Sequence, residues 1–183
     1  MTPTIALLDA GALTRHLNDL AALLHACVHD GASIGFILPH TMDDAERFWR
    51  HKVLPGVEGG GVSLLVARQG ERVVGTVQLD HDTPGNGRHR AEVRKLLVHP
   101  EARRQGVARA LMAAIEDEAG RRARSLLVLD TRSDSEAEPL YLSLGYQVAG
   151  RIPHYCRDNF QDRLDPTTVM YKTLTGAMKG TGA

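Results

Sequence analysis

The spacing of apolar and polar residues along the chain predicts alternating strands and helices. Helical periodicity runs from Gly11 to Val28, follows a capping pair at Thr41 and Asp44, and recurs over 106–124 and 135–144. This order of elements predicts a mixed α/β fold in which a helix crosses between two buried strands. Short apolar runs bounded by turn residues predict seven strands, at 4–8, 62–68, 73–79, 91–98, 126–129, 146–151 and 168–173.

Length and composition indicate a soluble globule. Of the 183 residues, 43% are hydrophobic and 24% are charged, which predicts one domain over 1–175 and a flexible tail at 176–183. No apolar run approaches the ~18 residues that span a bilayer, and the N-terminal region lacks the basic segment of a signal peptide. The two cysteines lie far apart in the sequence, so we expect a reduced, cytoplasmic protein without membrane partners.

The charges balance overall but are unevenly distributed. Residues 88–124 hold ten Lys and Arg against five Asp and Glu, whereas 1–60 and 125–165 each hold four basic and seven acidic residues. A nucleic-acid-binding domain is usually basic throughout, so the pattern argues against that class. A basic centre between acidic flanks fits a small polyanion bound at one place and a cationic ligand beside it.

The segment 96–109 predicts a phosphate-binding turn. A buried strand and a basic loop lead into an amphipathic helix, whose first N–H groups are unpaired and carry the positive end of the helix dipole. Gly106 lets an anion approach the backbone, and Arg103, Arg104 and Arg109 add positive charge. The alternative is a surface turn with solvated arginines. The Gly-x-Gly-x-x-Gly and Walker A motifs are both missing from this segment.

Two motifs make the chain resemble the GNAT N-acetyltransferases. Residues 103–108, Arg-Arg-Gln-Gly-Val-Ala, match the acyl-CoA loop Arg/Gln-x-x-Gly-x-Gly/Ala of that family. Residues 137–146 match its later helix, written Ala-x-x-Leu-Tyr-x-x-x-Gly-Phe/Tyr. The resemblance covers residues 60–174. It implies a GNAT fold, with a central mixed, twisted sheet of about six to seven strands and helices on both faces. It also implies acetyl-CoA as co-substrate.

The resemblance further implies which residues bind acetyl-CoA. The backbone at the end of the strand before the loop is expected to hold the pantetheine arm and to polarise the thioester carbonyl, because two central strands splay apart in this family. Asp134 stands where the family often has Asn. The expected cofactor-binding set is Leu96, Leu97, Val98, Arg103, Arg104, Gln105, Gly106, Val107, Ala108, Arg109 and Asp134.

Direct attack of an amine on a thioester needs a base for the amine and an acid for the thiolate. Glu92, on the strand that leads to the loop, is the expected base; the alternative is an exposed carboxylate or an ion-pair partner of Arg90 or Arg94. Asp130, at the carboxyl end of the next strand, is expected to relay a proton, with helix capping as its alternative. Tyr141 matches the family tyrosine and is expected to protonate the thiolate.

Three further segments narrow the expected acceptor. Residues 31–36, 86–93 and 152–156 resemble the tabtoxin-resistance branch of the family, which acetylates the amine of a β-lactam amino-acid toxin. Substrate identity depends on a few pocket residues, so it transfers poorly between relatives. Ser33 and Phe36, in a glycine-rich lid, and Tyr155 are the expected substrate contacts.

The sequence therefore predicts an enzyme that acetylates a primary amine on a small molecule, with an amino-acid-like toxin or antibiotic favoured. The alternatives are acetylation of protein N-termini or lysines, and a non-catalytic acyl-CoA sensor. His25 and His29 share a helix face, but no third ligand is apparent, so no metal site is predicted. A monomer and a homodimer are both compatible with the sequence.

Overall fold

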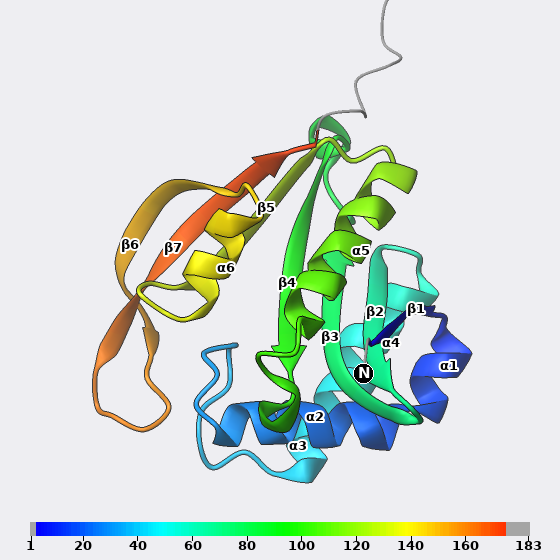
Figure 1. Cartoon of the computed structure of the whole chain (residues 1–183), viewed down its shortest axis with the longest axis vertical. Helices are drawn as coiled ribbons and strands as arrows, with labels where there is room; N and C mark the ends of the chain where they lie inside the picture. The colour runs from blue at the N-terminus through cyan, green and yellow to red at the C-terminus, as the bar shows by residue number, and fades with distance from the viewer. Residues whose placement is uncertain (1–2, 175–183) are drawn as a thin grey trace, which may run out of the picture.

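The computed structural model describes residues 3–174, which form a mixed sheet with helices on both faces (Figure 1). The sheet has seven strands in the order β1-β2-β3-β4-β5-β7-β6, and every neighbouring pair is antiparallel except β4 and β5. The predicted fold class is confirmed. The strands are β1 (Thr4–Leu8), β2 (Val62–Gln69), β3 (Arg72–Asp80), β4 (Arg90–Val98), β5 (Leu126–Arg132), β6 (Gln147–Arg157) and β7 (Leu164–Thr173).

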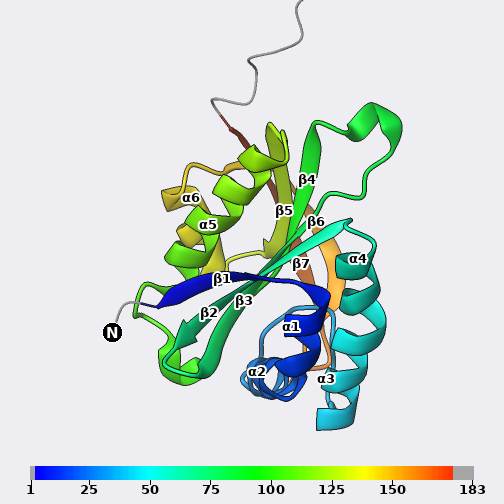
Figure 2. The same cartoon turned by 90° about the vertical axis from the view of Figure 1, so that its right-hand side faces the viewer.

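The helices fall into two groups on opposite faces of the sheet (Figure 2). One group is α5 (Val107–Arg121) with α6 (Ala137–Ser143), which pack on a core that includes Leu127 and Val93. The other group covers the face that holds Leu64 and Val66. It comprises α1 (Ala10–Arg15), α2 (Leu17–His29), α3 (Met42–Phe48), a π-helical turn (Trp49–Val53) and α4 (Leu54–Glu58). No helix among residues 3–174 is long and apolar enough to cross a membrane.

Local capping signals in the sequence are confirmed where they are strong. Thr41 and Asp44 form a reciprocal capping box at the start of α3, with Asp44 N donating to Thr41 Oγ1 at 3.1 Å and Thr41 N donating to Asp44 Oδ2 at 3.0 Å. The helix predicted from Gly11 to Val28 is instead two helices, because the backbone leaves the helical region at His16 (φ −97°, ψ 14°). The predicted tail at 176–183 lies outside the described residues.

The two late strands are longer than predicted. β6 and β7 pair as an antiparallel hairpin, whereas the sequence predicts strands only over 146–151 and 168–173. Nearly every residue of β6 is exposed, because β6 is the edge strand of the sheet. An edge strand exposed on both faces has no apolar alternation, so periodicity could not show its full length.

The sheet opens between its two central strands. β4 and β5 pair only where Arg90–Glu92 lie beside Leu126–Val128, and the strands then diverge (Figure 1). β4 also carries a bulge, since its register against β3 shifts between Thr76 and Gln78, and Lys95 there has φ +49°. The carboxyl-terminal half of β4 therefore has no strand partner on the β5 side.

Gly75 sets how closely α5 lies against the sheet. A Cβ at this position would stand 2.9 Å from the Leu97 carbonyl oxygen and 3.0 Å from side-chain carbons of Leu111 and Val107. Real Cβ atoms are not found so close to backbone oxygens, so any larger residue must push the first turn of α5 away. Val107 is the first residue of that helix, so Gly75 helps to fix the start of α5.

We expect Gly75→Ala to lower the free energy of unfolding by roughly 1–3 kcal/mol, the usual cost of overpacking a core. Urea denaturation followed by circular dichroism measures the change. Gly150→Ala is the matched control, since Gly150 also lies in a strand but has no atom within 4 Å of the position that a Cβ would occupy. Equal stability of the two variants would show that α5 adapts freely at this contact.

Candidate functional site

The loop after β4 ends in an exposed helix N-terminus. A 3-10 turn at Pro100–Ala102 leads to Gly106, which has φ +79° and precedes α5. No side chain caps this helix, and its first hydrogen bond runs from Ala110 N to Gly106 O at 3.0 Å. The N–H groups of the first turn therefore lack acceptors within the helix and carry the positive end of its dipole. A Cβ on Gly106 would meet no atom within 4 Å, so the backbone is open to a ligand.

The basic side chains of this loop point in different directions. Arg104 is exposed and pairs with exposed Glu136 at 3.1 Å, and Arg109 donates to Ser143 Oγ at 2.9 Å. Arg103 instead forms an ion pair with Asp30 at the end of α2. Of the predicted residues, Arg104 and Arg109 thus extend toward α6, whereas Arg103 reaches the opposite face.

Gln105 and Asp134 border the same region. Gln105 Nε2 donates to the Glu101 carbonyl at 3.0 Å, which folds the loop back on itself. Asp134, in the loop before α6, has φ +59°, and its exposed carboxylate accepts from Arg151 at 3.1 Å. A carboxylate has no N–H to donate, so Asp134 cannot reproduce a hydrogen bond that an Asn side chain would donate.

The end of β4 presents backbone groups to the splay. His99 N donates to the Val74 carbonyl of β3 at 2.9 Å. Because N–H directions alternate along a strand, Leu97 also faces β3, whereas Leu96 and Val98 face the side where β5 has diverged. The Val98 carbonyl, in agreement, accepts from Cys27 Sγ rather than from a strand.

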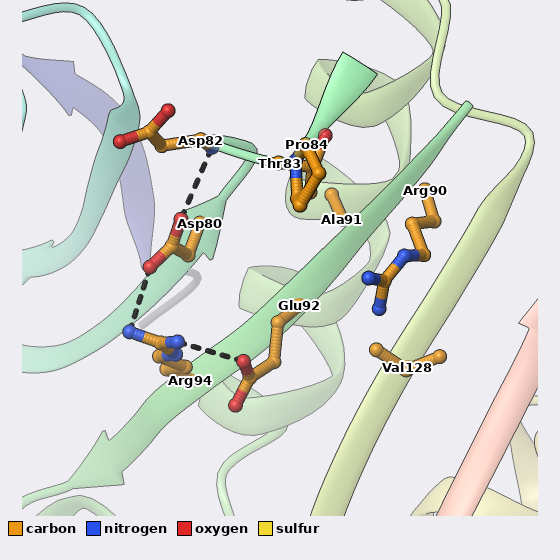
Figure 3. Close-up of a pocket in the computed structure, with 9 residues that line it drawn as sticks. All are labelled: Asp80, Asp82, Thr83, Pro84, Arg90, Ala91, Glu92, Arg94 and Val128. Atoms are coloured by element: carbon orange, nitrogen blue, oxygen red, sulfur yellow. Dashed lines mark hydrogen bonds and ion pairs between the residues drawn. The ribbon is translucent and has the colours of Figure 1, made fainter. Parts of the chain in front are cut away.

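Glu92 lies on the face of the sheet opposite α5 and belongs to a charge network (Figure 3). Its Oε2 accepts from Arg94 at 2.7 Å, and the other nitrogen of that guanidinium lies 2.6 Å from Asp80 Oδ2. The hydrogen bond from Arg94 to Glu92 raises the pKa of Arg94. Glu92 is thus an ion-pair partner of Arg94, which was the alternative prediction for this residue. Because one guanidinium is shared by two carboxylates, this end of the network keeps a net negative charge.

Asp130 and Tyr141 flank the same opening. Asp130 lies within β5 and caps no helix; its Oδ2 accepts from Thr167 Oγ1 at 2.9 Å. Tyr141 in α6 is 7% exposed, and its ring meets the Tyr146 ring edge-on at 5.8 Å. Burial and the nearby Asp130 charge raise the pKa of Tyr141, so the phenol stays protonated. The Tyr141 hydroxyl donates to no other residue between 3 and 174.

The predicted substrate contacts lie where the loop after α2 meets the β6–β7 hairpin. Ser33 Oγ is 3.4 Å from Cys156 Sγ, and Asn159 Nδ2 donates to the Ala32 carbonyl at 3.2 Å. Phe36 faces inward, whereas Tyr155 is 54% exposed on the hairpin. The hairpin tip therefore contacts the α2–α3 loop on this side of the sheet.

Sequence reasoning missed Lys95. Its ammonium donates to the Ile34 carbonyl at 2.6 Å and lies 5.5 Å and 5.8 Å from the ring centres of Phe36 and Phe48. Burial and the Arg94 charge lower the pKa of Lys95. The residue ties the bulge of β4 to the α2–α3 loop, and a lysine inside an apolar strand run is the one signal that marks it in the sequence.

The described residues hold no cluster of three or more His, Cys, Asp and Glu side chains suited to a metal ion. His25 and His29 stack at 4.1 Å between ring centres, which is a packing contact. The site therefore consists of an open, uncapped helix N-terminus, a half-paired strand and a carboxylate network.

Comparison with known proteins agrees with this geometry. Residues 60–148 match the model of the acetyltransferase (GNAT) domain family. An uncharacterised N-acetyltransferase of Azospirillum brasilense is 29% identical over 69% of this chain and 74% of that protein. Two other curated acetyltransferases align over 42% and 56% of their own length.

Solved structures share the fold over nearly the whole chain. A ribosomal-protein-alanine N-acetyltransferase from Brucella melitensis is 25% identical, with a TM-score of 0.73 and coverage of 93% of this chain and 99% of that one. An acetyltransferase from Salmonella typhimurium, determined with its cofactor acetyl-CoA, is 22% identical, with a TM-score of 0.73 and coverage of 96% of both chains.

Fold, site and relatives define the class: this is an enzyme that transfers an acyl group from an acyl-CoA to nitrogen. Within that class, residues 60–148 match the GNAT domain model, and the chain is similar to N-acetyltransferases of the GNAT family.

Proposed function

We propose that this protein transfers acetyl from acetyl-CoA to the primary amine of a small molecule, with an amino-acid-like toxin or antibiotic favoured. One observation carries the proposal: the unpaired edge of β4 runs from the helix terminus at Gly106 to the carboxylate network at Glu92. The edge connects the proposed phosphate site at Gly106 with the proposed amine site at Glu92. The two sites are therefore separated by about the length of one strand.

The residues around Gly106 fit the pyrophosphate of acetyl-CoA. The first-turn N–H groups of Val107, Ala108 and Arg109 are free within the helix, and Gly106 leaves open space beside them. The exposed guanidinium of Arg104 adds charge at the same end. Bound there, acetyl-CoA supplies an acetyl group activated as a thioester. The Leu96 and Val98 N–H groups hold the pantetheine arm and polarise the carbonyl oxygen.

Glu92 acts as the base. An alkylammonium has a pKa of ~10 and must lose a proton before its nitrogen can attack a carbonyl carbon. Glu92 takes that proton directly or through water, and Asp130 on the neighbouring strand is a second acceptor. Together with Asp80, these carboxylates also attract a cationic acceptor to this face.

Tyr141 acts as the acid. As the new C–N bond forms and the C–S bond breaks, the sulfur leaves as a thiolate and takes the phenolic proton. The raised pKa of Tyr141 keeps that proton in place until it is needed.

A small acceptor is favoured by the contact between the β6–β7 hairpin and the α2–α3 loop. The hairpin tip contacts the α2–α3 loop through Asn159 and Cys156, which leaves less room for a folded polypeptide. The likeness to tabtoxin-resistance enzymes at residues 31–36 and 86–93 points to an amino-acid-like amine. Protein N-terminal acetylation is the second candidate, because the Brucella melitensis relative is a ribosomal-protein-alanine N-acetyltransferase.

Release of free thiol from acetyl-CoA tests the proposal. The protein is incubated with acetyl-CoA and a panel of small amines, aminated antibiotics and peptides with free N-termini. Turnover with small amines and not with peptides supports the proposal. Faster turnover with peptides would favour the second candidate.

We expect Glu92→Gln to lower kcat/KM for the amine by about tenfold. This is below the ~10²–10⁴ of a sole general base, because Asp130 can also accept the proton. Steady-state kinetics at saturating acetyl-CoA measures the change. Glu71→Gln is the control, since Glu71 pairs with Arg68 in an exposed turn. A double variant with Asp130→Asn should lose more than the two single losses combined, because each carboxylate can replace the other; a double loss equal to the combined small single losses would remove both from the proton path.

A further inference from the structure

A pocket of about 140 Å³ lies beside Glu92, on the face of the sheet opposite α5 (Figure 3). Its floor is formed by β4 and β5, and its wall by the turn after β3. It adjoins the point where β4 and β5 begin to diverge, since Glu92 and Val128 are the last paired residues. An acceptor in this pocket therefore has its amine next to the proposed base. The lining residues are Asp80, Asp82, Thr83, Pro84, Arg90, Ala91, Glu92, Arg94 and Val128.

Charges alternate along the strand that floors the pocket. Arg90, Glu92 and Arg94 point to one face, because side chains two residues apart share a face of a strand. Asp80 of β3 is the register partner of Glu92 and shares Arg94 with it. This end of the pocket therefore holds two carboxylates around one guanidinium and attracts a cation.

Arg90 is the cation at the other end. Its guanidinium forms no ion pair or hydrogen bond with any residue between 3 and 174, in contrast to Arg94. Figure 3 shows it folded over the pocket floor toward Val128. The adjacent Gly87 makes room for it, because a Cβ there would stand 3.0 Å from Arg90 Nε. The strand and the turn at Gly85–Gly87 thus leave an exposed, unpartnered guanidinium beside the pocket.

We propose that Arg90 binds the carboxylate of the acceptor, so that the acceptor is an amino acid or a close derivative with a free carboxylate. The proposal rests on the amine-acetylating function above. The anionic end at Glu92 and the cationic end at Arg90 lie two residues apart on β4, roughly 7 Å. A zwitterion spans that interval, with its ammonium at Glu92 and its carboxylate on the fork of Arg90.

The test compares acceptors that differ only in the carboxylate. L-Serine is paired with ethanolamine and L-lysine with cadaverine, and each is assayed with wild-type protein and with Arg90→Gln. We expect wild-type protein to prefer the amino acid of each pair. Arg90→Gln should raise the KM for the amino acid by roughly 10- to 100-fold, the effect of losing a charged hydrogen-bonded pair. The KM for the decarboxylated partner should change less than about threefold.

Two further variants and a binding measurement sharpen the result. Arg88→Gln is the matched control, since Arg88 is exposed nearby but does not line the pocket. Arg90→Lys should restore only part of the preference, because a lysine cannot form the bidentate contact. Calorimetric titration of L-serine into the wild-type protein and each variant, in the presence of CoA, should rank the proteins in the same order without turnover.

The outcomes separate this proposal from the function on which it depends. Equal use of amino acids and their decarboxylated partners by wild-type protein would overturn the role of Arg90 and leave the amine-acetylating function standing. An equal loss for both members of a pair in Arg90→Gln would show a general structural effect and would also overturn it. If no amine of either kind accepts acetyl, the proposed function fails, and this proposal with it.

Discussion

Tyr141→Phe should lower kcat by about 100-fold or more while leaving the affinity for acetyl-CoA nearly unchanged. General-acid assistance is worth ~10²–10⁴ in rate, and the substitution removes only the hydroxyl. The ring of Tyr141 packs against Tyr146 and stays in place, so folding is preserved. Burial and the Asp130 charge raise the pKa of this phenol, so no loss of activity from its ionisation is expected below pH ~10. Steady-state kinetics over pH ~6–10 and calorimetry with CoA give the two numbers.

A second tyrosine provides the control for that experiment. Tyr171 in β7 donates its hydroxyl to Gln147 at 2.8 Å, so Tyr171→Phe also removes one phenolic oxygen. Its kcat should match that of the wild-type protein. If Tyr141→Phe turns over as fast as Tyr171→Phe, the proton for the leaving sulfur comes from elsewhere.

Gly106→Val should weaken acetyl-CoA binding by about 100-fold. A non-glycine residue at φ +79° costs roughly 1–2 kcal/mol, and the branched side chain enters the open space above the first-turn N–H groups. Relief of that strain moves the N–H groups that would hold the pyrophosphate, and each lost charged hydrogen bond is worth ~1.5–3 kcal/mol. Calorimetric titration with CoA measures the dissociation constant, and kcat at saturation should change much less.

Gly60→Val separates strain from ligand contact. Gly60 has φ +71° and, like Gly106, no atom within 4 Å of a Cβ, but it lies between α4 and β2. Both variants should lose similar stability in urea, and only Gly106→Val should lose affinity for CoA. Unchanged affinity in Gly106→Val would mean that the pyrophosphate binds at another place.

The parts of the fold that the sequence predicted are those with strong local signals. The hairpin of β2 and β3, the capping box at Thr41 and the helix that starts after Gly106 each depend on residues close in sequence. The sequence predicted that the phosphate-binding loop, the end of β4 and the carboxylates lie around one opening. The splay between β4 and β5 leaves the end of β4, and the loop that follows it, beside such an opening. The roles of the individual site residues stay predictions.

What the sequence could not predict depends on register between distant segments. Arg94 is shared between Glu92 and Asp80 only because β3 and β4 pair with a bulge. The bulge turns Lys95 toward the α2–α3 loop, and although a lysine in an apolar run is noticeable, no local pattern predicts the position of the bulge. The direction of Arg103 toward Asp30 likewise depends on where α2 ends beneath the sheet. Such contacts are set by tertiary packing, which overrides local preference.

The divergence of β4 from β5 places an unpaired strand edge in the middle of a sheet. Proteins usually shield such edges, since they recruit strands from other molecules and lead to aggregation. An extended amide chain such as pantetheine satisfies the same donors that a neighbouring strand would. Ligand that binds only the folded form adds stability in proportion to the logarithm of its concentration. If acetyl-CoA binds along this edge as proposed, the solubility and stability of the protein should rise with the supply of its own acyl donor.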